Sequence, residues 1–402
     1  MGNMRKHLRS LLSRPDQWKT FMKAGLIAGA PLGSPAPSDH LTETPQFGSN
    51  PGALRMFSFV PPGLQDGCPL VVVLHGCTQS AASYDLGAGW STLAERFGFG
   101  LLLPEQQRLN NPNGCFNWFQ SGDIERGHGE AASIRQMVMT MVSNHGIDPA
   151  RVFVTGLSAG GAMTSVMLAT YPDVFAGGAI IAGLPYGAAT NVQQAFETMR
   201  QCPLRAARAW GDLVRKASRH KGPWPRVSVW HGDADGTVIP SNAGEIIKQW
   251  ADVHGVPIQP SFEAKVDGYP RQVWVNDEGD EMIESYTIPR MAHGTPLATG
   301  AADDQCGAVG PFLLEVGISS SFHIARFFGL ASASRSAEHS RRSVPTPVLH
   351  MSDETDCATA SAEPLAGEVL EPNFWPHSKQ PHLDIGAVIT KALRTAGLLK
   401  GG

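Results

Sequence analysis

Charged residues, cysteines and long apolar runs are all sparse in this sequence of 402 residues. Lys, Arg, Asp and Glu make up only 17% of the chain and leave a net charge of −4, which argues against a protein that binds nucleic acid or an anionic membrane surface. No segment approaches the ~18 uninterrupted apolar residues that a membrane-spanning helix needs. With 42% hydrophobic residues, the composition differs from that of an intrinsically disordered protein. We expect a soluble globular protein without integral membrane association, in an oligomeric state that the sequence leaves open.

The six cysteines are scattered along the chain. They form no Cys-x-x-Cys pair and no other paired-ligand spacing, so neither a disulfide scaffold nor a structural zinc site is expected. An even number permits one or two disulfides in an oxidising compartment without requiring them.

The N-terminal region lacks the pattern of a secretory signal peptide. Such a signal needs an apolar stretch of roughly 7–15 residues behind its charged start. Here polar residues interrupt the apolar ones at every third or fourth place. This spacing favours a short amphipathic helix up to about Ala24, followed by an extended arm rich in Gly, Pro, Ala and Ser. We therefore expect a helix and an arm over residues 1–50.

Apolar runs alternate with helical patterns between residues 51 and 330. Strands are predicted over residues 54–60, 69–74, 99–103, 151–155, 177–182, 227–230 and 284–288, and helices over residues 90–97, 130–145, 159–171 and 242–254. The run Pro69–Leu74 is continuous and rich in valine, as in a central parallel strand covered on both faces. The alternation predicts an α/β fold with a mainly parallel central sheet and helices on both faces.

The composition changes again after residue 330. Residues 331–376 are rich in Ser, Ala, Glu and Pro and predict a disordered linker. In residues 377–402, apolar residues at helical spacing predict a C-terminal helix, which either docks on the main domain or serves as a small interaction helix.

The pentapeptide Gly156–Gly160 matches G-x-S-x-G. A buried strand is predicted directly before it and a helix directly after it, which is the setting that this nucleophile motif needs. Small neighbours allow the turn to lift the Ser158 hydroxyl above the sheet, and a helix N-terminus behind it stabilises negative charge. We interpret Ser158 as a catalytic nucleophile. The alternative is a glycine-rich turn with a buried serine.

A serine nucleophile needs a base, and the base needs an acid that fixes its tautomer. In α/β-hydrolases the order along the chain is Ser, Asp or Glu, and then His, with the acid just past a later strand. The segment His231–Val238 follows the strand predicted over residues 227–230 and contains two candidates. We favour Asp235, which lies further into the loop, and expect Asp233 to cap the turn.

The base must be a histidine from a later loop. The region between the acid loop and the end of the main domain contains His231, His254, His293 and His323. His254 ends a predicted helix, where a C-terminal cap is the simpler role, and His323 lies in a helical pattern. His293 follows the strand predicted over residues 284–288, in a loop rich in turn residues. We predict His293 as the base, with a structural loop histidine as the alternative.

The oxyanion of the transition state needs two backbone N–H donors. One is expected from Ala159, the residue after the nucleophile, and the other from the loop after the strand predicted over residues 69–74. In that loop the N–H of Cys77 is the natural candidate. His75 precedes the serine, which is the wrong order for the base, so we expect it to shape the loop.

Five segments, in order, resemble the esterase/polyhydroxybutyrate (PHB) depolymerase family over roughly residues 50–330. They are Leu74–Gln79, Pro104–Gln106, Cys115–Phe119, Gly156–Gly161 and His231–Asp235. This family comprises serine hydrolases that cleave the ester bonds of short-chain polyhydroxyalkanoates, and it is similar to feruloyl and acetylxylan esterases. The resemblance implies an α/β-hydrolase fold with a triad of Ser158, Asp235 and His293.

The resemblance also implies that Cys77 and Ala159 form the oxyanion hole and that Cys77 can be linked to Cys115 beside it. In the third segment, Asn117 and Trp118 are candidates for lining a substrate cleft. Exposed aromatics there would suit a polyester face or a feruloyl ring. A core position for Trp118 is the alternative.

The expected function is a serine esterase that hydrolyses poly-3-hydroxybutyrate or its oligomers through an acyl-enzyme, without metal or cofactor. The alternative is a feruloyl or acetylxylan-type carboxylesterase on the same triad. A non-catalytic interaction protein would have no need of a complete Ser-Asp-His set and an intact oxyanion loop. The family implies an extracellular protein, whereas the N-terminal pattern favours the cytoplasm. No β-rich polymer-binding module is recognisable after residue 331, which shifts the expectation toward soluble or amorphous esters.

Overall fold

The computed structural model describes residues 40–331. The N-terminal helix and the first part of the arm lie outside the described residues, as do the linker after residue 331 and the helix expected over residues 377–402. The end of the arm is described. It includes the short strand β1 (Thr42–Glu43), which pairs with β2 (Arg55–Phe59) in antiparallel fashion.

Residues 40–331 build a ten-stranded sheet in the order β1-β2-β4-β3-β5-β6-β7-β10-β9-β8. The remaining strands of this sheet are β3 (Cys68–Leu74), β4 (Gly100–Glu105), β5 (Ile147–Leu157), β6 (Gly177–Ile181), β7 (Arg226–Gly232), β8 (Phe262–Val266), β9 (Tyr269–Val275) and β10 (Glu281–Ile288). The six adjacent strands β4-β3-β5-β6-β7-β10 pair with one another in parallel. Antiparallel strands extend the sheet at both ends, with β1 and β2 beyond β4 and with β9 and β8 beyond β10. The predicted mainly parallel sheet is confirmed.

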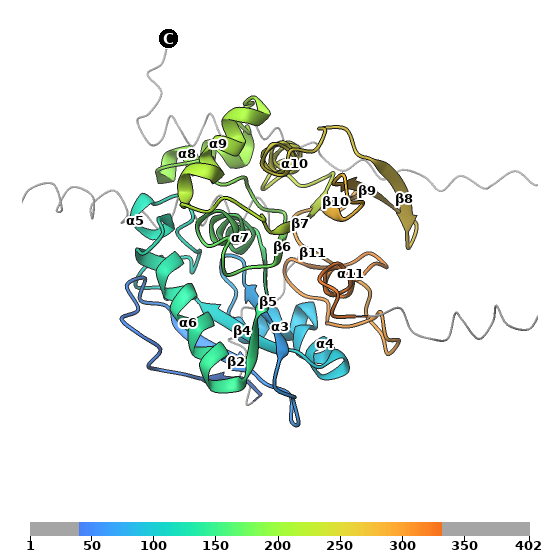
Figure 1. The fold of residues 1–402 in the computed structure, drawn as a ribbon. Helices are drawn as coiled ribbons and strands as arrows, with labels where there is room; N and C mark the ends of the chain where they lie inside the picture. The colour runs from blue at the N-terminus through green and yellow to red at the C-terminus, as the bar shows by residue number, and fades with distance from the viewer. Residues whose placement is uncertain (1–39, 332–402) are drawn as a thin grey trace, which may run out of the picture. The chain divides into compact units, whose positions relative to one another are not determined.

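Helices cover both faces of the sheet (Figure 1). One face carries α5 (Ser121–Ile124), α6 (Gly129–His145), α7 (Ala159–Thr170), α8 (Val192–Arg200), α9 (Ala207–Ala217) and α10 (Ser241–His254). The other face carries α3 (Ala81–Ala88), α4 (Trp90–Phe97) and α11 (Ser320–Phe327). The four predicted helices correspond to α4, α6, α7 and α10.

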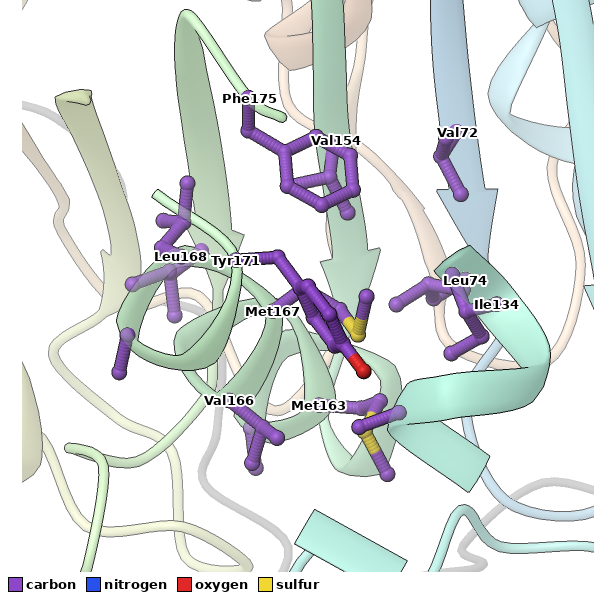
Figure 2. Close-up of a cluster of buried hydrophobic side chains, with 14 of the residues drawn as sticks. Val72, Leu74, Ile134, Val154, Met163, Val166, Met167, Leu168, Tyr171 and Phe175 are labelled. Atoms are coloured by element: carbon purple, nitrogen blue, oxygen red, sulfur yellow. The ribbon is translucent and has the colours of Figure 1, made fainter. Parts of the chain in front are cut away.

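The central strand β3 supplies side chains to both hydrophobic clusters. Leu70, Val72 and Leu74 face α6 and α7, whereas Val71 and Val73 face α3 and α4. Figure 2 shows the first cluster, in which residues from three elements pack with the methionines of α7. Each fully buried side chain of this size stabilises the fold by about 1.5–3 kcal/mol. The carboxyl ends of β3 and β5, which the predicted nucleophile and oxyanion loops follow, are therefore held rigidly.

Two parts of the fold were not predicted from the sequence. They are the hairpin β8–β9 and the small parallel pair β11 (Thr295–Leu297) and β12 (Leu313–Glu315). The first four residues of β8 are exposed, so the strand lacks the apolar alternation that marks a half-buried strand. The turn between β8 and β9 contains Asp267 and Gly268, both with positive φ. This is the geometry that a two-residue hairpin turn requires.

Candidate active site

Ser158 lies at the sharp turn between β5 and α7. Its backbone has φ 58° and ψ −115°, a region that costs a residue with a side chain about 1–3 kcal/mol. The backbone N–H of Ser158 donates to the carbonyl of Ile181 in β6 at 2.9 Å, which fixes the turn to the sheet. The Ser158 side chain makes no capping hydrogen bond to α7, so its hydroxyl is not used to close the helix end.

The glycines around Ser158 allow two backbone segments to meet. A Cβ at Gly160 would overlap the carbonyl oxygens of Leu74 and His75, and one at Gly156 would overlap Gly160. The start of α7 therefore packs directly against the end of β3. This contact places the nucleophile turn beside the loop of residues 75–79, which we call the oxyanion loop.

The oxyanion loop is shaped by His75, as the sequence predicted. Its Nδ1–H donates to the carbonyl of Gly76 at 2.8 Å, and its Nε2 accepts from the backbone N–H of Gln106 at 3.1 Å. Burial lowers the pKa of His75, so the ring is held neutral in this tautomer. Cys77 is joined to Cys115 by a disulfide, the pairing that the family resemblance implied.

The two predicted oxyanion donors lie on the contacting segments. Cys77 is in the oxyanion loop, and Ala159 is the first residue of α7. Within residues 40–331, no acceptor takes up the backbone N–H of either residue. Both groups are therefore available to an incoming negative oxygen.

Asp235 and His293 are brought together by the loops after β7 and β10. Oδ2 of Asp235 lies 2.7 Å from Nδ1 of His293, and Oδ1 accepts the backbone N–H groups of Thr237 and Val238 at 2.8 and 2.9 Å. Burial by itself would raise the pKa of Asp235, but hydrogen bonds from His231 and His293 outweigh it and hold the pKa well below its usual range. Asp235 is therefore an ionised, oriented partner for His293.

His231 is a second imidazole beside the same carboxylate. Its Nε2 lies 2.8 Å from the carbonyl of Val238 and 3.3 Å from Oδ2 of Asp235. Because the carbonyl can only accept, Nε2 carries the proton, and it faces both oxygens at once. The other nitrogen, Nδ1, is buried without a hydrogen-bond partner in the described part of the chain. Sequence reasoning named His231 as a histidine of this region but gave it no role.

Asp233 binds the neighbouring loop instead of a histidine. Its Oδ1 accepts the backbone N–H of Arg290 at 2.5 Å, and its own N–H donates to Ile288. Gly232 reinforces this junction, because a Cβ there would overlap the carbonyl of Met291. The structure thus gives Asp233 a structural role at the loop junction and leaves Asp235 as the partner of His293.

The structure corrects the expectation for Asn117 and Trp118. Trp118 is only 6% exposed and belongs to the hydrophobic core, which was the alternative position. Asn117 is also buried. Its side-chain amide donates to Glu130 and its Oδ1 accepts from Asn111. The Trp118 ring is taken up by packing in the core, and the Asn117 side chain is taken up by hydrogen bonds within the protein, so neither is the exposed cleft-lining group that was expected.

The other two candidate histidines have structural partners. His254 is the last residue of α10, and its Nε2 donates to the carbonyl of Pro225 at 3.1 Å, while burial lowers its pKa to about 4. The C-cap of that helix is Gly255, so His254 ties α10 to the segment before β7. His323 in α11 pairs with Asp267 of the β8–β9 turn at 2.7 Å. Neither reaches the Asp235 carboxylate.

Residues 40–331 contain neither the pattern of a metal site nor that of a membrane-spanning helix. No cluster of three or more His, Cys, Asp or Glu residues suited to a metal ion occurs there. No helix in the same range combines the length and apolarity required to cross a membrane.

The sequence pattern of the family described as Esterase PHB depolymerase matches residues 54–264. This chain belongs to that family. It is 46% identical over 327 residues to a poly(3-hydroxyalkanoate) depolymerase C of Paucimonas lemoignei, and the aligned region covers 80% of this chain and 79% of the relative. It is also 33% identical over 276 residues to an acetylxylan esterase of Coprinopsis cinerea, with 67% of this chain and 73% of the relative covered.

A solved structure agrees with this placement. An acetyl xylan esterase from Aspergillus awamori superposes with a TM-score of 0.61 at 26% identity, covering 72% of this chain and 99% of that one. As a member of the esterase PHB depolymerase family, the chain is a carboxylic ester hydrolase with the α/β-hydrolase fold, as the sequence predicted.

Proposed function

We propose that this family member is a serine esterase whose triad is Ser158, Asp235 and His293. The observation that carries the proposal is the 2.7 Å contact between Asp235 and Nδ1 of His293. With Nδ1 engaged, Nε2 is the ring nitrogen left to take a proton from a serine hydroxyl. The strained turn at Ser158 and the packed glycines around it support the role of Ser158 as nucleophile.

In the proposed reaction Ser158 Oγ attacks the ester carbonyl while His293 Nε2 removes its proton. Asp235 stays ionised and stabilises the imidazolium that forms. The low pKa of Asp235 supports this, because an ionised carboxylate is the form that attracts a positive ring. His293 then returns the proton to the leaving alcohol, and the acyl group remains on Ser158.

The N–H groups of Cys77 and Ala159 would stabilise the negative oxygen of the tetrahedral intermediate. A water molecule, deprotonated by His293, then attacks the acyl carbon, and His293 returns that proton to Ser158 Oγ as the bond to the acyl group breaks and the acid is released. Every step uses side chains and backbone amides of this chain, and none needs a metal or other cofactor. One oxyanion donor of this kind is typically worth a factor of about 10²–10³ in rate.

We further propose that the substrates are short-chain polyhydroxyalkanoates, namely poly-3-hydroxybutyrate or its oligomers. The identity to the Paucimonas lemoignei depolymerase supports this substrate class, since it extends over 80% of the chain. The second candidate is an acetylxylan or feruloyl type of ester. The acetylxylan esterase of Coprinopsis cinerea, at 33% identity, favours that reading.

A matched pair of substrates separates the two candidates. Purified protein is given 3-hydroxybutyrate oligomers with amorphous poly-3-hydroxybutyrate in one assay, and methyl ferulate with acetylated xylan in another, with Ser158→Ala as control. We expect release of 3-hydroxybutyrate that falls by at least ~10³ in the variant. Release of ferulate or acetate alone would keep the triad and replace the substrate class.

Labelling by a fluorophosphonate probe tests the nucleophile without assuming a substrate. The wild-type protein should be labelled and Ser158→Ala should not, while both give the same circular dichroism spectrum. A folded wild-type protein that resists labelling would contradict the esterase mechanism.

A further inference from the structure

A second buried carboxylate lies behind the oxyanion loop, outside the proposed triad. Glu130 is 1% exposed and sits in the first turn of α6. Its Oε1 accepts from the side-chain amides of Gln106 at 2.5 Å and Asn117 at 2.8 Å, and its Oε2 accepts from the backbone N–H of Asn117 at 2.8 Å. These donors are neutral, and within residues 40–331 Glu130 forms no ion pair.

The amides that face Glu130 are fixed in their donor orientation. Oε1 of Gln106 already accepts from the backbone N–H of Gln107 and from the Asn110 side chain. Oδ1 of Asn117 accepts from the Asn111 side chain in the same way. Turning either amide over would break these bonds, so both amides present N–H groups to Glu130. Such a pocket is complementary to a carboxylate, which accepts and does not donate.

The first connection from this pocket to the oxyanion loop runs through hydrogen bonds of Gln106 and ends in a disulfide. The side chain of Gln106, while bonded to Glu130, also donates to the carbonyl of Cys115 at 3.2 Å. Cys115 is joined by the disulfide to Cys77, whose N–H is the proposed oxyanion donor. Asn117, held twice by Glu130, lies two residues further along the same segment.

The second connection runs through His75. The backbone N–H of Gln106 donates to Nε2 of His75, whose Nδ1–H donates to the carbonyl of Gly76. Gly76 precedes Cys77, so its carbonyl and the Cys77 N–H belong to the same peptide group. Holding that carbonyl in place fixes the direction of the N–H.

The helix that carries Glu130 is itself immobilised on the sheet. Ile134 of α6 is buried in the same cluster as Leu74 of β3, and both are shown in Figure 2. Leu74 immediately precedes the oxyanion loop. The Glu130 carboxylate is therefore a fixed point relative to the strand from which the loop departs.

We propose that Glu130 is a positioning residue that holds the oxyanion loop, through Gln106 and the Cys77–Cys115 disulfide, so that the Cys77 N–H points at the developing oxyanion. The inference rests on the proposed esterase function. Glu130 touches neither substrate nor nucleophile and acts through the loop alone.

The hydrogen bonds from Gln106 and Asn117 to Glu130 are strongest when the Glu130 carboxylate is ionised. Burial raises the pKa of Glu130 to about 8, and the nearby Asp123 of α5 adds to the rise, whereas the amides of Asn117 and Gln106 oppose it. The segment from β4 and the segment of Cys115 bring only neutral amides to the carboxylate, and His75 is neutral. The fully bonded carboxylate thus predominates at alkaline pH.

The test compares Glu130→Gln with the wild-type protein at pH 9. We expect kcat on a small soluble ester to fall by about 10- to 100-fold with KM unchanged within about twofold, because a misplaced oxyanion donor affects the transition state more than substrate binding. Hydrogen exchange of the amides of residues 76–78 should accelerate by about tenfold or more. The buried glutamate Glu284 of β10, which pairs with Arg271 of β9, supplies a matched control as Glu284→Gln.

The outcomes are distinguishable. If Glu130→Gln keeps the wild-type kcat and exchange rates, or if Glu284→Gln reproduces both changes, the positioning role is wrong. If Glu130→Gln does not fold, Gln106→Met should reproduce part of the loss, about 3- to 10-fold, because it removes the side-chain links to Glu130 and Cys115 together with the bonds that Gln106 accepts from Gln107 and Asn110. Unchanged kinetics in that folded variant would overturn the inference. If the wild-type protein hydrolyses no ester, the proposed function fails, while the exchange measurement still tests the hold on the loop.

Discussion

The nucleophile side and the acid–base side of the candidate site are held by different kinds of contact. On the nucleophile side, backbone packs on backbone at Gly160 and Leu74, and a disulfide fixes Cys77. On the acid–base side, side chains converge on one carboxylate, that of Asp235, which is shared by His293 and His231.

The two halves of the site therefore differ in how strongly pH can change their contacts. Backbone contacts and a disulfide do not titrate, so the oxyanion geometry is set mainly by packing. The contacts of Asp235 depend on protonation, because imidazole and carboxylate change charge with pH. Glu130, with its raised pKa, is a titrating group that hydrogen bonds connect to the nucleophile side.

The largest expected effect comes from removing the charge on the acid–base side. Asp235→Asn should lower kcat by about 10⁴-fold, because His293 would lose the partner that fixes its tautomer. Asp233→Asn is the matched control, since Asp233 contacts only the loop junction, and its kcat should stay within about threefold. Steady-state kinetics on one ester checks both variants, and equal losses would show that the two carboxylates share one role.

Breaking the covalent contact on the nucleophile side should have the next largest effect. Reduction of Cys77–Cys115, which closes a segment of 38 residues, should destabilise the protein by about 2–4 kcal/mol. It should also lower kcat by about tenfold without affecting KM, because the Cys77 N–H loses one of its two supports. Urea unfolding and kinetics with and without reductant measure the two effects. Reduced protein with full activity would show that the hydrogen bonds through His75 suffice.

Replacing His231 tests how far the acid–base side depends on the second histidine beside Asp235. His231→Phe removes one of the donors to Asp235 and should lower kcat by about tenfold, while His231→Gln keeps an N–H donor and should lose less. Asp235, with its pKa held low, contributes stability above the ordinary carboxyl range that is lost as pH falls through its folded pKa. In His231→Phe the folded pKa of Asp235 should rise, so this contribution should be smaller and its loss should be complete at a higher pH. Unfolding free energies between pH 3 and 7 reveal the shift, and superimposable curves would contradict it.

The smallest effect is expected from an ion pair that belongs to neither side. Arg126 and Asp173 pair at 2.6 Å on the surface, where solvent screens the charges. Asp173→Asn should change the unfolding free energy by less than ~1 kcal/mol and leave kcat unaltered. A larger kinetic change would mean that the site is coupled to the surface more widely than the two sides suggest.

The parts of the fold and site that the sequence predicted are those with local signals. The valine run of β3 and the Gly-x-Ser-x-Gly turn each occupy consecutive residues, and Asp235 and His293 follow Ser158 in the order that α/β-hydrolases share. Chemistry and position along the chain were enough to name these residues.

The parts that the sequence did not predict depend on contacts between distant segments. Glu130 resembles any acidic residue in a first helical turn. The residues next to it in the sequence do not indicate that it is buried and hydrogen-bonded to Gln106 and Asn117. Trp118 likewise could be assigned to the core only once its neighbours were placed. His231 differs, because its position in the segment of Asp235 was a signal that could have drawn attention to it.

The outermost strand β8 has a consequence for how the protein behaves when concentrated. An open edge strand offers backbone groups to strands of other molecules, and a long apolar edge invites fibrils. β8 has only five residues, and Glu263 and Lys265 are exposed on it. Charges on so short an edge disfavour strand exchange between molecules. Concentrated stocks are expected to resist fibril growth from this edge during storage, and neutralising both residues would shorten their shelf life.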